Sequence, residues 1–366
     1  MTIRDAKYLS IAGELKRDIL AGKYEKSKRF PSEETLSRRF GASRPTIERA
    51  LRELKREGLL ESRAGSGSYL TFAAKNATGS LGIIAPDYKA IDFFSKLCDV
   101  IAADARACGY SVLMGDVSAP DAANRGHWAI KLAEAYAARR TAGVFLEPVD
   151  LIPKSHAATK KVLSILASKS IPVVLLDRDY LPFPGRSNYD LVGIDNVQSG
   201  YRIASHMIAS GARNIRFITH PDYANAIRGR IQGVAQAAID SGLPWKSAYV
   251  IEGDSSDESL FRRLMRGKNA PDAFVCRNDP TAAQLVQTLA KLGVSVPGDV
   301  LVAGFDDGEI ARLMNPPLTT IRQPVKTLAG IAIASLLERI RTPSLAPRTI
   351  LLDAPLVVRG STCPSA

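Results

Sequence analysis

The chain has 366 residues, 46% of them hydrophobic and 23% charged, and its 49 Lys and Arg exceed its 37 Asp and Glu by 12. This length predicts two or three domains. The sequence lacks an apolar run long enough to cross a bilayer, the apolar core of a signal peptide, and any Cys or His spacing typical of a disulfide framework or a zinc site.

These exclusions predict a cytoplasmic protein with no membrane partner, no metal ion and no cofactor. The positive charge is concentrated near the N-terminus, where residues 1–72 hold 16 Lys and Arg against 10 Asp and Glu, and the other 294 residues hold 33 against 27. One fifth of the chain therefore carries half of the excess charge. A basic segment is typical of a module that binds a polyanion, because neutralised phosphates release counterions. A solvated surface without a partner is the alternative.

The apolar spacing of the N-terminal segment predicts helices. Leu15 and Ile19 belong to an apolar stripe that predicts a first helix over residues 8–21. Ser32 is a candidate N-cap of a second helix that ends at Gly41, with acidic residues in its first turn.

A third helix follows after a short turn. Ser43 is its candidate N-cap, and its apolar face comprises Ile47, Ala50, Leu51 and Leu54. Two helices joined by so short a turn predict a helix-turn-helix, whose second helix presents its N-terminal residues to base edges in the major groove.

The segment "LLESRAGSGSYLT" predicts a β-hairpin after the third helix. Gly65 and Gly67 would let its turn bend sharply and approach a duplex closely. The alternative, a GxGxxG phosphate loop, is disfavoured because Leu70 replaces the third glycine and no helix follows.

The stretch "RFPSEETLSRRFGASRPTIERALRELKREGLLESRAGSGSYLT" resembles the winged helix of the gluconate-repressor (GntR) family, and the resemblance covers residues 8–72. It implies that Arg44 and Thr46 contact DNA and that the turn from Gly65 to Gly67 enters the minor groove.

At two positions the chain departs from that family, which commonly has arginine where Glu34 and Glu48 stand here. A carboxylate cannot replace arginine at a phosphate or a guanine, although it accepts a hydrogen bond from a cytosine amine. Neighbouring arginines, Arg52 among them, are therefore expected to take over contacts, and the operator sequence is left open. The DNA-contacting residues that we predict are Ser32, Arg38, Arg39, Ser43, Arg44, Thr46, Arg49, Gly65, Ser66 and Gly67.

Beyond a small, polar linker at residues 73–79, apolar runs alternate with helical patterns. The runs are "LGIIAP", "YSVLMGD", "AGVFLEP", "IPVVLLD", "LVGID", "IRFITH", "YVIEGD", "AFVCRND" and "VLVAGFDD". The intervening helical segments are 93–107, 124–140, 197–209, 226–240 and 280–291. This alternation predicts parallel βαβ units, which either close into a barrel or form two doubly wound halves.

The segments "FFSKLCDVIAADARACGYSVLM", "LVGIDNVQSGYRIASHMIASGARNIRFIT", "RGRIQGVAQA" and "VCRNDPTAAQLVQTLAKLGVSVPGDVLVAGFDDGEIARLMNPPLTTIRQP" resemble the effector domain of the lactose/galactose-repressor (LacI/GalR) family. The resemblance implies an α/β fold of the periplasmic-binding-protein type, in which two Rossmann-like lobes with parallel sheets are joined by three crossovers around a ligand cleft. We expect a winged helix-turn-helix over residues 1–72 and an effector-binding and dimerisation domain over residues 80–366. Within the latter, lobe 1 comprises about residues 80–190 and 325–353, and lobe 2 about residues 191–322 and 354–366.

The resemblance also implies the residues of an effector site. They are Phe93, Phe94, Asp177, Arg230, Asn278 and Asp306. Carboxylates accept pairs of sugar hydroxyls, amide and guanidinium groups donate to the remaining oxygens, and an aromatic ring covers an apolar face.

Several simpler interpretations of these residues stay open. An Asp after a parallel strand often only caps the next helix, and Asp279 is better explained as a cap or hinge residue than as a ligand. Adjacent helical residues point about 100° apart, so we expect only one of Phe93 and Phe94 to face the cleft. Ala226 stands where relatives often carry a polar group, so one contact to a sugar is expected to be missing.

We expect a DNA-binding repressor whose operator affinity is controlled by a small polar effector, a sugar. Two heads on a two-fold axis read a palindrome together, so we expect a homodimer on a palindromic double-stranded operator. The alternatives are a purine or nucleoside effector, corepression instead of induction, and a DNA-binding protein without an effector. Motifs of hydrolases, P-loop enzymes and metalloproteases are absent from the sequence, so we expect no enzyme activity and no catalytic residues.

Overall fold

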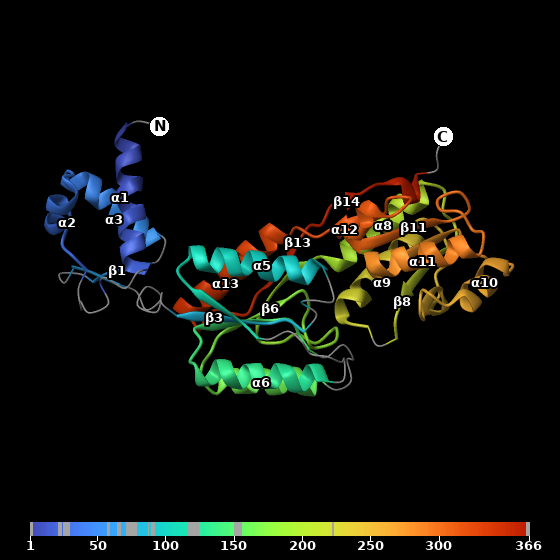
Figure 1. Cartoon of the computed structure of the whole chain (residues 1–366), viewed down its shortest axis with the longest axis horizontal. Helices are drawn as coiled ribbons and strands as arrows, with labels where there is room; N and C mark the ends of the chain where they lie inside the picture. The colour runs from blue at the N-terminus through green and yellow to red at the C-terminus, as the bar shows by residue number, and fades with distance from the viewer. Residues whose placement is uncertain are drawn as a thin grey trace.

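The computed structural model describes residues 3–20, 24, 30–56, 59–63, 67–70, 79–86, 88, 92–115, 124–149, 156–221 and 223–363. These residues form a small head and two α/β lobes, which follow one another along the long axis of the molecule (Figure 1). None of the helices within these ranges is both long and apolar enough to span a bilayer. The predicted α/β class is confirmed, and the barrel alternative is excluded because the two lobes contain separate open sheets.

Three helices and a hairpin form the head. They are α1 (Ile3–Leu20), α2 (Glu33–Phe40), α3 (Arg44–Arg56), β1 (Leu60–Arg63) and β2 (Gly67–Leu70). The first helix begins five residues before its predicted start. β1 and β2 are antiparallel, and their last pair is Arg63 with Gly67. The predicted turn residues Gly65 and Ser66, and all but the last residue of the predicted linker, lie outside the described residues.

Local chemistry explains where α2 begins and ends. The Ser32 hydroxyl accepts a hydrogen bond from the Thr35 amide at 3.2 Å, which is the N-cap predicted from the sequence. Gly41 ends the helix in the left-handed conformation, with φ of +54°, which favours glycine. Leu36 and Ile47 then pack with the apolar face of α1 in the core of the head.

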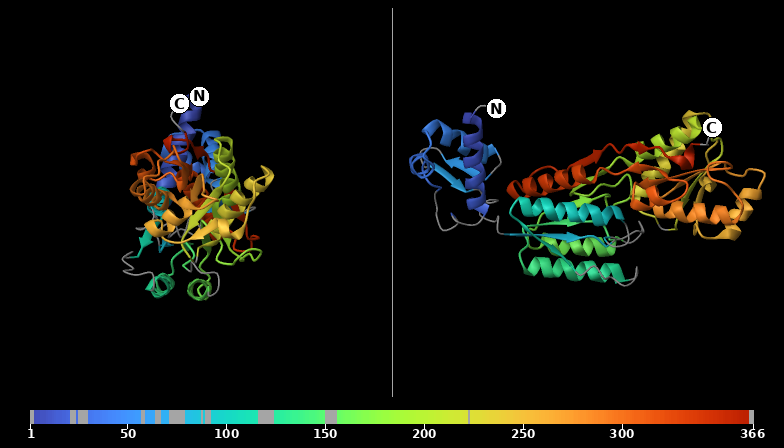
Figure 2. Two further views of the ribbon diagram at one scale, coloured as in Figure 1. Left: turned by 90° about the vertical axis from the view of Figure 1, so that its right-hand side faces the viewer. Right: turned by 45° about the horizontal axis from the view of Figure 1, so that its top comes forward.

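Lobe 1 contains a six-stranded parallel sheet in the order β13-β7-β6-β5-β3-β4. The strands are β3 (Ser80–Ile84), β4 (Ser111–Met114), β5 (Gly143–Leu146), β6 (Val173–Leu176), β7 (Asp190–Ile194) and β13 (Thr349–Leu352). The helices are α5 (Asp92–Ala107), α6 (Arg125–Ala138), α7 (Ala157–Ala167) and α13 (Val325–Arg341). Figures 1 and 2 show α5 and α13 on one face of the sheet and α6 on the other, and α6 packs beside α7.

Lobe 2 contains a second six-stranded sheet in the order β14-β12-β11-β10-β8-β9, parallel except for β14. The strands are β8 (Ile215–Thr219), β9 (Val250–Glu252), β10 (Ala273–Cys276), β11 (Leu301–Asp306), β12 (Thr319–Arg322) and β14 (Leu356–Val357). The helices are α8 (Asn196–Ala209), α9 (Asn225–Asp240), α10 (Glu258–Arg266), α11 (Asp279–Lys291) and α12 (Glu309–Leu313), with short 3₁₀ turns at Ser247–Tyr249 and Gly360–Thr362.

The chain passes between the lobes three times. It crosses after β7, between β12 and α13, and between β13 and β14. The resemblance places the first lobe boundary at about residue 190, and β7 keeps its pairing with β6 and β13 up to Ile194, which pairs with Leu352. The first crossover therefore follows Ile194, within about four residues of that approximate boundary.

Candidate ligand cleft and nucleic-acid interface

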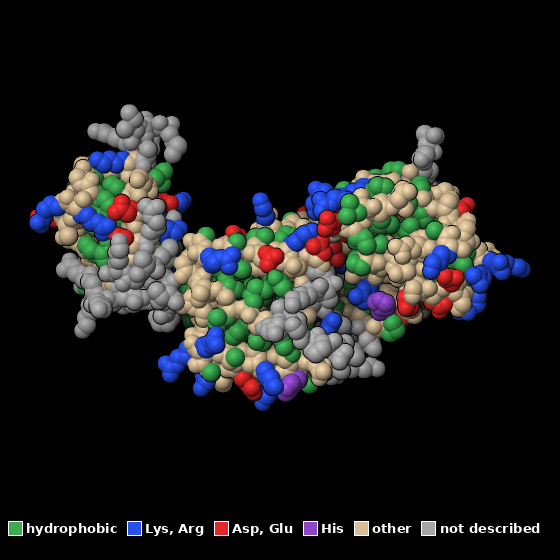
Figure 3. Space-filling model, viewed as in Figure 1, with side chains coloured by type: hydrophobic (Ala, Val, Ile, Leu, Met, Phe, Trp, Pro, Cys, Tyr) green, Lys and Arg blue, Asp and Glu red, His purple; other side chains and the backbone are tan. Residues whose placement is uncertain are grey.

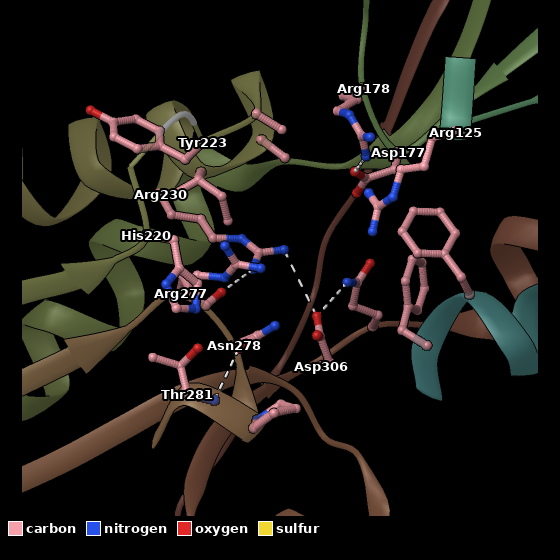
Figure 4. A pocket seen from close by; sticks show the side chains of 17 residues that line it. Arg125, Asp177, Arg178, His220, Tyr223, Arg230, Arg277, Asn278, Thr281 and Asp306 are labelled. Carbon is pink, nitrogen blue, oxygen red and sulfur yellow. Dashed lines mark hydrogen bonds and ion pairs between the residues drawn. The ribbon is translucent and has the colours of Figure 1, made fainter. Parts of the chain in front are cut away.

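A cleft of about 300 Å³ lies between the two lobes. Its lining includes all six side chains that the resemblance implies for the effector site, Phe93, Phe94, Asp177, Arg230, Asn278 and Asp306. In Figure 4, Asp177 faces Arg230 and Asp306 across this space. The volume lies at the small end of the range for ligand sites, roughly 300–1,000 Å³.

The fold brings these residues together because strand ends and helix starts converge at the cleft. Asp177 follows β6, Asp306 is the last residue of β11, and Asn278 precedes α11. The first turn of α5 contributes both Phe93 and Phe94, with ring centroids 5.1 Å apart. The expectation that only one of them faces the cleft is wrong, because α5 begins at the cleft and adjacent positions of its first turn both border it.

Arg230 is a firmly anchored group in the cleft. Its side chain is 5% exposed, its Nε donates to the side-chain Oδ1 of Asn196 at 2.9 Å, and its Nη1 donates to the backbone carbonyl of Arg277 at 2.5 Å. The guanidinium carbon lies 4.3 Å from the centroid of the Phe305 ring. These contacts hold the arginine in one orientation before any ligand arrives.

Asp306 lies beside Arg230 in lobe 2. Its Oδ1 accepts a hydrogen bond from the Gln323 amide at 2.7 Å and lies 3.8 Å from Nη2 of Arg230. Burial raises the pKa of Asp306, and the charge of Arg230 and the Gln323 hydrogen bond offset this only in part. A carboxyl group held this way pairs with sugar hydroxyls at little cost in further ordering.

Asp177 stands on the lobe 1 side and is held by Arg178. Nη1 of Arg178 lies 3.1 Å from Asp177 Oδ2 and 3.1 Å from Glu147 Oε1, and its Nη2 donates to the Pro148 carbonyl at 2.8 Å. One buried arginine thus serves two carboxylates, and only Asp177 borders the cleft.

The backbone is strained at both cleft aspartates. The φ angles of Asp177 and Asp306 are +69° and +109°, in the region that favours glycine. Non-glycine residues in such conformations cost about 1–3 kcal/mol each and cluster at functional sites. Gly193 accommodates the first of these turns, since a Cβ at this position would lie 2.7 Å from the Asp177 carbonyl oxygen.

Asn278 and Asp279 play different parts at the start of α11. The Asn278 side-chain oxygen accepts from the Thr281 amide and hydroxyl, at 3.1 and 2.7 Å, so it caps the helix and can offer the cleft only its amide hydrogens. Asp279 is fully buried and accepts from the Gly308 amide and the Thr320 hydroxyl. Burial and the nearby Asp306 charge raise the pKa of Asp279 well above its usual range. Asp279 therefore holds the loop after β11 from behind the cleft.

Further residues line the cleft that are not among those predicted from the sequence. They are Arg125, Arg178, His220, Tyr223, Ala224, Ile227, Arg277, Pro280, Thr281 and Gln323. Arg178, Arg277 and Gln323 adjoin predicted residues or stand in the segments "CRND" and "IRQP", so the same resemblance could have found them. Ala226 also lines the cleft and adds no polar group. Burial and the charge of Arg277 lower the pKa of His220, which favours its neutral form.

The exposed surface of the head carries basic side chains (Figure 3). Arg44, at the start of α3, has an 81% exposed side chain, and its Nε lies 2.9 Å from the Glu33 carboxylate. The hydroxyls of Ser43 and Thr46 lie 2.8 Å apart in the same turn. Arg38 is equally open, with an i,i+4 pair to Glu34 at 3.2 Å.

Two of the predicted DNA-contacting arginines are exposed and also contact α1. Arg39 lies 2.5 Å from Asp18 and 3.1 Å from Glu14, both on α1. Arg49 stacks on the ring of Tyr8 at 4.5 Å. These partners give both arginines a role in packing α1 against α2 and α3.

Comparison with known proteins agrees with this two-part construction. Residues 7–70 match the family of bacterial regulatory proteins, gntR family, and residues 204–362 match the periplasmic binding protein-like domain. The HTH-type transcriptional regulator DegA of Bacillus subtilis is 32% identical over 204 residues, which are 55% of this chain and 59% of the relative. The chain thus spans about three fifths of that relative's length.

Two further similarities cover more of the chain. The arabinose metabolism transcriptional repressor of Geobacillus stearothermophilus is 27% identical over 97% of both chains. The solved structure of the transcriptional regulator CelR with cellobiose has a TM-score of 0.66 at 21% identity and covers 91% of this chain and 100% of its own, a likeness that concerns the fold. The chain therefore joins a winged helix of the gntR type to a periplasmic-binding-protein-like domain with the fold of LacI-family regulators.

Proposed function

We propose that the protein is a transcriptional repressor that binds operator DNA through its head and responds to a sugar bound between its lobes. One observation carries the proposal: a single chain combines an exposed basic helix, α3, with a cleft whose side chains suit vicinal hydroxyls. The names of relatives support it, since one that matches 97% of the chain is an arabinose metabolism repressor and a structure of the same fold contains cellobiose.

The arrangement of the cleft suggests how a ligand would act. Asp177 belongs to lobe 1, whereas Arg230 and Asp306 belong to lobe 2, so one sugar touching all three would favour a single lobe-to-lobe angle. A ligand shifts an equilibrium only by its differential affinity for the two states, and about 1–3 kcal/mol is typical of useful coupling.

The edge strands β13 and β14 are where we propose that a second copy packs. Both strands end their sheets, and Leu351 and Val358 near them are 48% and 46% exposed. Pairing two copies through this edge would place two heads on one palindromic operator, which a single short recognition helix binds only weakly.

Two matched variants test the function in one gel-shift titration. Arg44→Ala is expected to abolish specific retention of operator DNA while sugar binding, followed by thermal shift, is unchanged. Asp306→Ala is expected to retain DNA and lose the sugar response. Arg262→Ala, which removes an exposed charge from α10, is the control and should behave like the parent protein. Specific retention by Arg44→Ala, or an unchanged sugar response in Asp306→Ala, would contradict the proposal.

A further inference from the structure

One edge of the exposed side of α3 carries a stripe of charged side chains. Arg44, Glu48 and Arg52 are four residues apart, so they follow one another along the helix outside its buried apolar face. Their side chains are 81%, 56% and 72% exposed. The stripe lies near α2, through the contact of Arg44 with Glu33, whereas Arg49 on another edge of α3 packs against Tyr8 of α1. The stripe is therefore an exposed side of α3 that can enter a groove.

The charges alternate in sign along this stripe. Glu48 Oε1 lies 2.9 Å from Nη2 of Arg52, and Arg44 stands one turn earlier on the same side. Both side chains of the Glu48–Arg52 ion pair are exposed, so the pair is weak. The two side chains separate readily when either can form a stronger contact. The flanking arginines also offset the repulsion between the carboxylate and DNA phosphates.

The chemistry of a carboxylate restricts which base it can face. An ionised carboxylate only accepts hydrogen bonds, and the donors in the major groove are the amino groups of cytosine and adenine. The adenine amino group lies between two acceptors that repel a carboxylate, its own N7 and the O4 of the paired thymine. The cytosine amino group has such an acceptor on one side only, the O6 of the paired guanine. Guanine and thymine present acceptors at the corresponding place and repel the carboxylate outright.

We propose that Glu48 selects cytosine at one position of each operator half-site, by accepting a hydrogen bond from its N4 amino group. The inference rests on the proposed function and adds a residue that determines specificity. Arg44 is nearer to the N-terminus of α3, where residues reach base edges, and Arg52 is further along the helix, where side chains reach phosphates. Glu48 lies between these two residues along the helix, so it would face a base between their two contacts. The spacing fits, since four helical residues advance about 6 Å, close to two base-pair steps of about 3.4 Å each.

The test is a selection of duplexes from a randomised pool by the full-length protein, its Glu48→Gln variant and its Glu48→Arg variant. The parent protein is expected to enrich cytosine at one position of each half-site. Glu48→Gln should enrich adenine there, because an amide pairs with N6 and N7, and Glu48→Arg should enrich guanine. Changing that cytosine to guanine in one purified site should weaken binding to the parent protein about 10-fold or more.

Glu34→Gln is the matched control. Glu34 forms the same kind of exposed i,i+4 pair, with Arg38, but on α2, which in this motif crosses the backbone. Its loss should strengthen binding to every duplex and leave the enriched sequence unchanged. If the parent protein, Glu48→Gln and Glu48→Arg all enriched the same sequence, the inference would be overturned and the proposed function would stand. Failure of the parent protein to enrich any sequence would overturn the proposed function itself.

Discussion

Asp190 is a buried carboxylate held by two arginines that come from distant parts of lobe 1. Its oxygens lie 2.8 Å from Nη2 of Arg339 and 3.2 Å from Nη2 of Arg348, and one accepts the Arg348 backbone amide at 2.8 Å. Burial alone would raise the pKa of Asp190, but the hydrogen bonds from Arg348 and Arg339 outweigh it and hold the pKa below its usual value. The carboxylate thereby ties α13 and the start of β13 to β7.

We expect Asp190→Asn to lower the free energy of unfolding by about 3 kcal/mol near pH 7, because it leaves two arginines without their buried counter-charge. The pKa of Asp190 is lower in the folded protein than in the unfolded chain. The stabilisation from its ion pairs is therefore complete above the unfolded pKa of about 3.9, and it is lost as the pH falls through the folded pKa. The difference between parent and variant should therefore narrow below about pH 4. Urea unfolding followed by fluorescence of Trp128 and Trp245, which both lie outside the head, measures it.

Asp353→Asn is the control for this experiment. Asp353 also pairs with an arginine, Arg202 at 2.7 Å, but its side chain is 65% exposed. Its loss should change the free energy of unfolding by less than about 1 kcal/mol. If both variants lost the same free energy of unfolding, the burial of Asp190 would not explain its contribution to stability.

At the scale of elements, α8 and α9 touch backbone to backbone. A Cβ on Gly233 would lie 1.9 Å from the Val197 carbonyl oxygen, and one on Gly200 would lie 2.1 Å from the Arg230 carbonyl oxygen. The two glycines let α9 approach α8 so closely that Arg230 reaches the side chain of Asn196. The packing of this helix pair thus sets the position of a cleft residue.

Gly233→Ala is expected to force α9 away from α8, to destabilise lobe 2 by about 3 kcal/mol or more, and to weaken sugar binding through the displaced Arg230. Differential scanning calorimetry and the sugar thermal shift measure the two effects. Gly330→Ala is the control, since Gly330 is exposed within α13 with nothing within 4 Å of the added Cβ. It should stabilise the protein by up to about 1 kcal/mol. A Gly233→Ala protein as stable as Gly330→Ala would contradict the close-packing argument.

Many of the helices and strands could be predicted from the sequence, because their formation depends on residues that are neighbours in the chain. The nine predicted strands are all present, and α5, α6, α8, α9 and α11 occupy the predicted helical segments within two residues at each end. Apolar periodicity and caps such as Ser32 are local signals. Where β7 ends does not depend on neighbouring residues alone. Pairing with β13, more than 150 residues later in the sequence, extends β7 to Ile194 and so sets where the first segment of lobe 1 ends.

At the scale of the whole molecule, the lobes are linked by more than the three crossovers. Asn225, at the start of α9 in lobe 2, donates to the backbone carbonyls of Asp179 and Leu181 in lobe 1, at 3.1 and 2.8 Å. Near the third crossover, Arg202 of α8 pairs with Asp353. Under the proposed function, a ligand in the cleft would add to these contacts and couple cleft occupancy to the lobe angle.

Such coupling must be reciprocal if the proposed function is right. A sugar that lowers operator affinity by a given factor should bind more weakly to the operator complex by the same factor, in the range of about 5- to 150-fold. Titration calorimetry of the sugar, with and without saturating operator duplex, gives one factor, and operator titration with and without the sugar gives the other. Unequal factors at equilibrium would show that the two ligands do not act on one pair of states.

Taken by itself, the amino-acid sequence determined the α/β class, the order of the nine predicted strands and five predicted helical segments, and the two-part construction. It also singled out six side chains that the fold gathers in one cleft. It did not single out β12, β13, β14, α7, α10, α12 or α13. Only the tertiary structure decided which partners the exposed arginines of the head have, since Arg39 and Arg49 contact α1 while Arg44 pairs with Glu33 of α2. It likewise decided that Asp279 is a buried acid behind the cleft. The physical reason is that periodicity and capping depend on neighbours within a few residues, whereas burial and charge pairing depend on groups that folding brings in from elsewhere in the chain.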